Sequence, residues 1–221
     1  ATLAMGVVGA LGSGSLKTLV AWQVIISVGT LLAPISLGSE AGLSAALFYL
    51  LSTTWTVGGL FLVSELVANQ RGSAQDRIVT APRMQNRTFL SVLFLVGAVA
   101  AAGLPPLSGF FGKLLILQSV QSGTEMAWLW SVLLIGSFLT VIAYSRAGSI
   151  VFWRTVDGHL EKPDPLNGRI SVAAGALTAL AVAIVVLAGP ITRYTDETAA
   201  QLFNNDAYIN ILQTPVVGED D

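Results

Sequence analysis

Long uncharged stretches separated by short clusters of charge are the feature that most constrains this chain. Lys17 and Glu40 are separated by 22 uncharged residues, and Arg87 and Lys113 by 25. A helix needs about 20 mostly apolar residues to cross the hydrocarbon of a bilayer. Only 11% of the 221 residues are charged, whereas a soluble domain has about 25% charged residues. The pattern therefore predicts an all-α, polytopic transmembrane helix bundle.

Counting from charge to charge predicts about six transmembrane helices. They are residues 1–16, 18–39, 41–64, 88–112, 126–145 and 170–192. The first is short, and the sequence opens inside an apolar run without a charged leader, so we expect a truncated helix rather than a signal peptide. We predict a membrane domain over residues 1–190 and an extracytoplasmic C-terminal tail over residues 191–221.

Basic residues gather on one side of the predicted membrane. If alternate links face alternate sides, one side holds nine of the eleven basic residues, namely Lys17, Arg71, Arg77, Arg83, Arg87, Arg146, Arg154, Lys162 and Arg169. Of the other two, Arg193 lies opposite and Lys113 lies inside a predicted broken helix. Cytoplasmic loops carry an excess of Lys and Arg, so we predict that the basic loops are cytoplasmic and that the tail ends outside.

Composition excludes several kinds of chemistry. The absence of cysteine rules out a disulfide framework, a thiolate zinc site and a cysteine nucleophile, and His159 is the only histidine. A net charge of −2 and the lack of a glycine-rich phosphate loop argue against nucleic-acid binding and nucleotide chemistry. We therefore predict no metal site, no cofactor, no catalytic residue and no nucleic-acid partner.

One predicted helix must be interrupted. Residues 88–121 would span about 50 Å as a straight helix, against a hydrocarbon core of about 30 Å. Within this segment, residues 103–109 read GLPPLSG, and Pro105 and Pro106 each remove a backbone donor. The freed carbonyls could line an ion path, as in transporters with discontinuous helices, or the prolines could make only a packing kink. Ser108 adjoins this break and is the hydroxyl that we select as functional.

Lys113 is the strongest candidate site residue. It follows the break in the apolar run 110–117 (FFGKLLIL), with no acidic residue nearby in sequence. A lysine at the centre of a transmembrane helix costs about 2.5 to 3.5 kcal/mol, so it should face protein or water. Partial desolvation favours the neutral amine, which would allow proton exchange near neutral pH. The alternative is a lysine that extends its ammonium to the membrane surface.

Two charged residues near the predicted cytoplasmic side are further candidates for a proton path. Glu65 ends the apolar run 58–63, and it could accept a proton at the cytoplasmic mouth or stabilise a helix end. Lys17 follows the link 12–15 (GSGS). It could pass protons, or serve only as an anchor that fixes the topology.

Three stretches resemble the proton-translocating antiporter subunits shared by Mrp-type cation/proton antiporters and respiratory complex I. Residues 16–22 (LKTLVAW) are similar to the family's lysine-started helix of the form D-x-K-x-L-x-A-Y-S-S, although Ser15 stands at the acid position and Trp22 at the tyrosine. Residues 47–51 (LFYLL) and 59–62 (GLFL) are similar to the next helix. Residues 103–113 (GLPPLSGFFGK) are similar to the family's broken helix, which implies that Lys113 is its terminal proton-channel residue.

The tail resembles the D subunit of Mrp antiporters more than complex I subunits, through residues 189–190, 194–195, 199–202 and 207–209. The resemblance implies the C-terminal half of a component of a monovalent cation/proton antiporter, with sodium as the expected cation. It also implies a bacterial inner-membrane location and other antiporter subunits, lipid, protons and monovalent cations as partners. Such a component is not an enzyme by itself. The alternatives are a proton-pumping membrane component of a complex I-like NADH-quinone oxidoreductase and a structural membrane scaffold.

Overall fold

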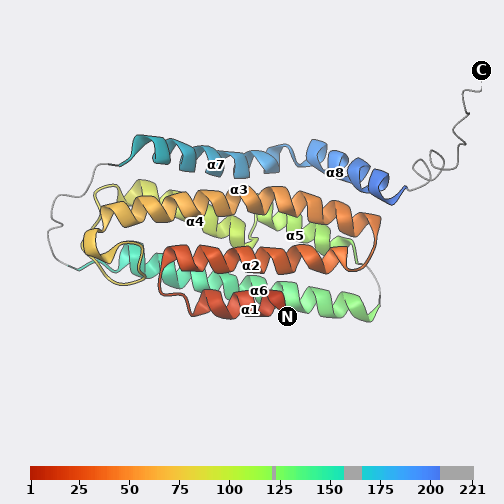
Figure 1. Cartoon of the computed structure of the whole chain (residues 1–221), viewed down its shortest axis with the longest axis horizontal. Helices are drawn as coiled ribbons and strands as arrows, with labels where there is room; N and C mark the ends of the chain where they lie inside the picture. Colours follow the sequence, from red (N-terminus) through yellow and green to blue (C-terminus); the bar gives the residue numbers. More distant parts are fainter. Residues whose placement is uncertain (121–122, 157–165, 205–221) are drawn as a thin grey trace, which may run out of the picture.

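The computed structural model describes residues 1–120, 123–156 and 166–204, and this part of the chain is helical with no strand (Figure 1). The predicted link around His159 and most of the predicted tail lie outside the described residues. The all-α class is confirmed. The α-helices are α1 (Thr2–Leu11), α2 (Leu16–Ile35), α3 (Glu40–Gln70), α4 (Arg87–Ala102), α5 (Ser108–Gln118), α6 (Thr124–Gly148), α7 (Gly168–Val186) and α8 (Ala188–Phe203). A short 3₁₀ turn, η1 (Gly72–Ala74), follows α3, and a π-helical turn, η2 (Ser149–Trp153), continues α6.

Serines in two of the links between the predicted helices cap the helices that follow. The side chain of Ser15 accepts a hydrogen bond from the backbone N–H of Thr18 at the start of α2. Ser39 does the same for Gly42 at the start of α3. Such N-caps satisfy donors that have no partner within the first turn of a helix. These two links therefore end one apolar helix and begin the next within a few residues.

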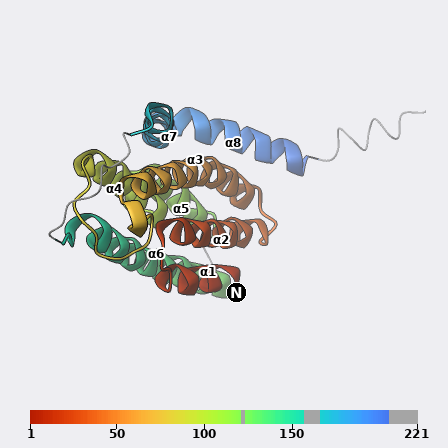
Figure 2. The same cartoon turned by 60° about the vertical axis from the view of Figure 1, so that its left-hand side comes forward.

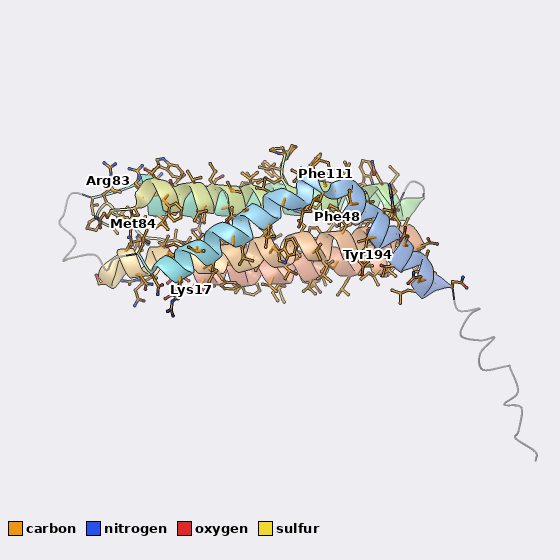
Figure 3. All side chains as sticks on the ribbon, turned by 90° about the horizontal axis from the view of Figure 1, so that it is seen from above. Lys17, Phe48, Arg83, Met84, Phe111 and Tyr194 are labelled. Atoms are coloured by element: carbon orange, nitrogen blue, oxygen red, sulfur yellow. The ribbon has the colours of Figure 1, made fainter. Side chains whose placement is uncertain are left out.

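The bundle is built around α3. This helix contacts α2, α4, α5, α7 and α8, while α6 packs against α1 and α4. Figure 1 shows α4 and α5 following one another along the long axis, beside α3 and α2. When the bundle is turned, α7 and α8 lie on its outside (Figure 2). Seen from above, they run obliquely across the other helices (Figure 3). This arrangement leaves α4 and α5 between α3 and α6.

Four segments are long and apolar enough to cross a membrane, which supports a multi-pass membrane protein. They are Leu16–Ile35, Glu40–Gln70, Met126–Trp153 and Gly168–Val186, and the shorter apolar helices are Thr2–Leu11 and Arg87–Ala102. The six predicted crossings correspond to α1, α2, α3, the pair α4–α5, α6 and α7. The domain boundary predicted at residue 190 falls within α8, and the side of the membrane on which α8 lies stays a prediction.

Candidate functional site

The helix from Arg87 is interrupted at Gly103, where its backbone turns into the left-handed region. Gly103 has φ +78°, a value that residues with a side chain rarely adopt. Its N–H donates to the carbonyl of Ala100, and the N–H of Leu104 donates to that of Val99. This pattern is a Schellman motif, which closes a helix C-terminus by satisfying two of its last four carbonyls. The carbonyls of Ala101 and Ala102 remain.

The two prolines explain why these two carbonyls are free. In an uninterrupted α-helix the N–H of residue i donates to the carbonyl of residue i−4. The partners of Ala101 and Ala102 would therefore be residues 105 and 106, and both are prolines without an N–H. The interruption predicted from GLPPLSG thus presents two carbonyl oxygens, at the negative end of the α4 dipole.

The amine of Lys113 lies at these two carbonyl oxygens. Its Nζ donates to the carbonyl of Ala102 at 2.8 Å and lies 3.5 Å from that of Ala101. A third hydrogen bond, of 2.9 Å, runs to the hydroxyl of Ser137 on α6. The side chain is 7% exposed and therefore faces the bundle rather than its surface. Lys113, which follows the break in sequence, therefore extends back to the carbonyls that the break leaves without backbone donors.

Glycines provide the space for this arrangement. A Cβ added to Gly103 would lie 2.6 Å from Cδ and 3.0 Å from Nζ of Lys113, so the lysine passes directly over the glycine. A Cβ at Gly109 would collide with the carbonyl oxygen of Ala100, and one at Gly112 would lie 2.8 Å from the ring of Tyr49 on α3. The start of α5 can approach α4 and α3 closely because these positions lack side chains.

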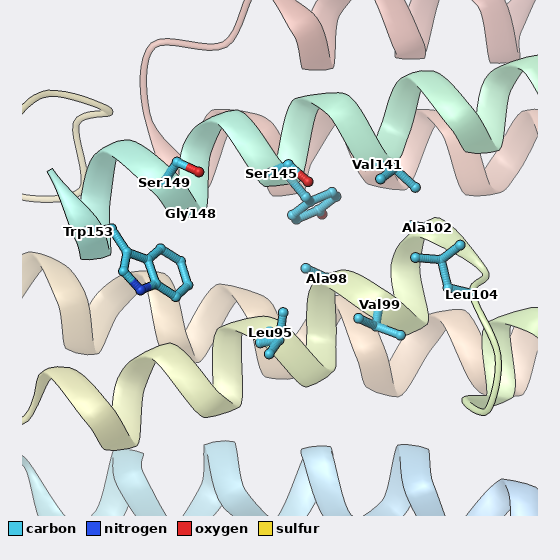
Figure 4. A pocket seen from close by; sticks show the side chains of 11 residues that line it. Leu95, Ala98, Val99, Ala102, Leu104, Val141, Ser145, Gly148, Ser149 and Trp153 are labelled. Atoms are coloured by element: carbon cyan, nitrogen blue, oxygen red, sulfur yellow. The ribbon is translucent and has the colours of Figure 1, made fainter.

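Two cavities, of about 260 Å³ and about 320 Å³, adjoin the break. The larger is lined by Lys113 and Ser137 together with apolar side chains such as Phe110 and Leu117. The smaller lies between α4 and α6 and extends from Leu104 towards Trp153 (Figure 4). Leu104 and Val141 line both cavities. Residues of the break therefore border both cavities, and Lys113 lines the larger of the two.

Lys113 has no acidic partner within the described ranges. The ion pair found there joins two other candidates, because Nζ of Lys17 lies 2.7 Å from a carboxylate oxygen of Glu65. Their side chains are 47% and 40% exposed, and solvent-exposed ion pairs contribute little to stability. Residues far apart in sequence thus meet at the end of the bundle where the sequence predicts the cytoplasmic mouth.

Asp76 lies at the same end of the bundle. Its carboxylate accepts a hydrogen bond of 3.0 Å from the backbone N–H of Lys17, and its carbonyl accepts one from Leu16. The lysine-started helix therefore receives an acidic group from the loop after α3, although Ser15 stands at the acid position of the sequence motif. A carboxylate at a helix N-terminus is favourable for both the free N–H groups and the dipole.

Arg71 fixes the loop that carries Asp76. It is 1% exposed, and its guanidinium donates to the carbonyls of Gln75, Arg77 and Val79. Burial lowers the pKa of Arg71, and the carboxylate of Asp76 opposes that change. An arginine remains charged at any relevant pH because its ordinary pKa is so high. Arg71 therefore supports the loop at this end of the bundle and does not titrate.

The structure adds residues that the sequence pattern did not single out. Ser108 is buried, as expected of a residue beside the break, but its hydroxyl has no hydrogen-bond partner in the described part of the chain. Instead, Ser137 accepts a hydrogen bond from the amine of Lys113, and Gln23 donates one to the carbonyl of Ala101. A single amide in the apolar helix Leu16–Ile35 was the available signal for Gln23, whereas nothing in the sequence distinguishes Ser137 from other helix serines. No group of three metal-ligating side chains is present among the described residues.

Comparison with known proteins identifies the family. Residues 1–143 match the family described as "NADH:quinone oxidoreductase/Mrp antiporter, TM". The chain is 33% identical over 230 residues to the D subunit of a probable K(+)/H(+) antiporter of Rhizobium meliloti, a match that covers 91% of this chain and 42% of the relative. It is 34% identical over 194 residues to the N subunit of the NADH-quinone oxidoreductase of Salinibacter ruber, covering 84% of this chain and 38% of that protein.

The fold has a solved counterpart. A chain in the structure of the Mrp complex from Dietzia sp. DQ12-45-1b superimposes with a TM-score of 0.78 at 21% identity, over 95% of this chain and 47% of that one. The present chain thus spans less than half the length of these relatives. Because the family match extends over more than half of the sequence, the chain belongs to the NADH:quinone oxidoreductase/Mrp antiporter transmembrane family.

Proposed function

We propose that this chain is part of a monovalent cation/proton antiporter complex and that it provides a section of the transmembrane proton path. The observation that carries the proposal is the site of Lys113. A single buried amine, held by two carbonyls and a hydroxyl without an acidic partner in the described residues, can gain or lose a proton without breaking an ion pair. Intramembrane lysines are rare and are usually functional.

The break offers a physical route for coupling. In the protonated state, the ammonium is attracted by the carbonyls of Ala101 and Ala102 at the end of α4. After the proton leaves, the neutral amine is attracted less and the side chain can reorient towards the cavity beside it. Lys113 would then pass a proton between the central polar path and one membrane face. Coupling to cation movement would require other subunits.

We assign Lys17 and Glu65 to the cytoplasmic mouth of the same path. Their ion pair is partly open to solvent, so a proton from the cytoplasm can reach the carboxylate. Pro105, Pro106 and Ser108 would maintain the interruption. The expected cation is sodium or potassium, because antiporter relatives named for each of these cations resemble this chain.

The second candidate function is that of a proton-pumping membrane component of a complex I-like NADH-quinone oxidoreductase. The similarity to the N subunit of the Salinibacter ruber enzyme supports this alternative. The same lysine and the same broken helix would serve a redox-driven pump. The two functions differ in what drives the proton, and that difference can be measured.

The deciding experiment uses everted membrane vesicles that contain the complete complex. For an antiporter, we expect that adding sodium or potassium chloride collapses an established pH gradient, and that an inactive quinone reductase does not prevent this. Choline chloride at equal ionic strength is the control. If only NADH and quinone establish proton movement, and neither cation dissipates a gradient, the oxidoreductase function replaces the antiporter.

The orientation can be tested with single cysteines because the chain has none of its own. Ser73 and Gln201 are exposed and lie at opposite ends of the bundle, after α3 and within α8. We expect Ser73→Cys to react with a membrane-impermeant maleimide only in everted vesicles, and Gln201→Cys only in right-side-out vesicles, since basic loops are retained in the cytoplasm. Labelling of both residues from the same side would contradict the predicted topology.

A further inference from the structure

Gln23 of α2 lies beside the lysine site without being part of it. Its side chain is 1% exposed, and its Nε2 donates to the carbonyl of Ala101 at 3.4 Å. This is the carbonyl that lies 3.5 Å from Nζ of Lys113. The amide and the amine therefore meet at one oxygen, which connects α2 to the broken helix.

The other end of the same amide is unsatisfied. Oε1 of Gln23 is buried and has no hydrogen-bond partner in the described part of the chain. A buried polar atom without a protein partner typically binds an ordered water molecule, since leaving it unsatisfied is costly. The geometry thus places a water-binding acceptor next to the carbonyl that Lys113 approaches.

Hydroxyl groups continue from Gln23 along the same face of α2. Ser27 and Thr30 follow at four and seven residues, which places them on one side of a helix, and both are buried. The hydroxyl of Ser27 lies 2.6 Å from that of Thr53 on α3. Tyr49, which is buried, lies one helical turn before Thr53 on α3. We name these four residues the hydroxyl cluster.

The cluster is physically linked to the lysine helix. Gly112, next to Lys113, packs directly against Tyr49, where a Cβ would not fit. In the predicted orientation, α2 runs from Lys17 at the cytoplasmic side towards the outside, so the cluster lies on the outer side of Gln23. Hydroxyls both donate and accept hydrogen bonds, and can therefore relay a proton through waters, which apolar side chains cannot do.

We propose that Gln23 is a positioning residue that holds water between Lys113 and the hydroxyl cluster, and that this amide–hydroxyl path carries the proton between Lys113 and the outer half of the membrane. The inference rests on the proposed antiporter function and adds a direction and named residues to it. Gln23 does not titrate. Its role is to fix the water next to the amine with its free Oε1.

The test uses the complete complex in everted vesicles, with Gln23→Met as an apolar substitution of similar length. We expect the maximal rate of cation-dependent proton exchange to fall about tenfold, the size of effect that follows from losing a hydrogen-bonded group in a rate-determining step. The apparent KM for the cation should not change. The solvent isotope effect, measured in H₂O and D₂O, should increase because proton transfer becomes limiting.

Gln23→Ser should retain exchange to within about twofold, because a hydroxyl with one additional water can replace the amide.

A second pair of variants covers the case in which Gln23→Met fails to assemble. Thr53→Val removes the hydrogen bond to Ser27, whereas Thr56→Val, three residues further along α3, removes a bond to the carbonyl of Ser52 in the same helix. We expect Thr53→Val to reduce exchange and Thr56→Val to leave it unchanged.

The outcomes separate this inference from the proposed function. Normal exchange and an unchanged isotope effect in an assembled Gln23→Met complex, while Lys113→Ala is inactive in the same vesicles, would overturn the path and leave the antiporter intact. Equal losses in Thr53→Val and Thr56→Val would also overturn it, since the effect would then come from packing. An active Lys113→Ala complex would instead contradict the role assigned to the lysine.

Discussion

Replacing Lys113 by alanine in the complete complex should reduce cation-dependent proton exchange by at least about a hundredfold, the range lost when a proton-transferring group is removed. Insertion and assembly should persist, because the substitution removes a buried charge from the membrane and not an ion pair. The carbonyl of Ala102 loses the donor from Lys113, while that of Ala101 keeps the donor from Gln23, and Ala102 lines the cavity of about 260 Å³, where water can replace the lost donor. The measurement is the dissipation of a pH gradient on adding sodium or potassium, with complex assembly checked by copurification.

Two further substitutions distinguish titration from mere charge. Lys113→Arg keeps the positive charge but should not restore exchange, because a guanidinium does not release its proton at a relevant pH. Lys113→Glu should retain part of the exchange, since a carboxyl group can also titrate. It should not reach the normal rate, because the charged carboxylate would face two carbonyl oxygens at the negative end of α4. Near-normal exchange by an assembled Lys113→Ala complex would reject the relay.

The sequence was most informative where a rule of backbone chemistry applies locally. Two adjacent prolines between glycines must interrupt a helix, and an apolar run containing one lysine must bury its amine or bring it to the surface. Both statements depend on a dozen consecutive residues, so the position of the break could be predicted, and Lys113 selected as a candidate, without knowledge of the rest of the fold.

Contacts between helices could not be predicted in the same way. In a soluble protein the polar face of a helix distinguishes surface from core, but a transmembrane helix is apolar on the side that faces lipid and on the side that faces protein. The sequence therefore does not show that Ser137 on α6 meets Lys113, or that Gln23 on α2 meets the carbonyl of Ala101. The contribution of Asp76 to the start of α2 was also hidden, because it depends on the path of a loop about sixty residues away.

The sequence also did not predict which charged residues pair with one another. Lys17 and Glu65 were candidates for separate reasons, and their ion pair follows from the antiparallel packing of α2 and α3. Ser108 was selected because it adjoins the break, yet the hydroxyl that binds the amine comes from another helix. Closeness in sequence to an unusual backbone feature is a weaker guide than the direction in which a long side chain extends.

Replacing both Pro105 and Pro106 by alanine should reduce exchange by at least about tenfold, equivalent to about 1.4 kcal/mol in the transport barrier. Each alanine restores an N–H whose helical acceptor is the carbonyl four residues earlier, which is Ala101 for residue 105 and Ala102 for residue 106. The continued helix would therefore compete with Lys113 for the same two oxygens. Alanine also favours a continuous helix by about 3 kcal/mol over proline at each interior position.

The single variants should differ, because Nζ of Lys113 lies 2.8 Å from the carbonyl of Ala102 but 3.5 Å from that of Ala101. Pro106→Ala should thus impair exchange more than Pro105→Ala. Pro190→Ala, an exposed proline in α8, is the matched control and should have no effect on transport. Exchange and assembly are measured together in each variant. If the double variant assembles and exchanges normally, the prolines make only a packing kink, and the carbonyls at the break are not required for the proton to move.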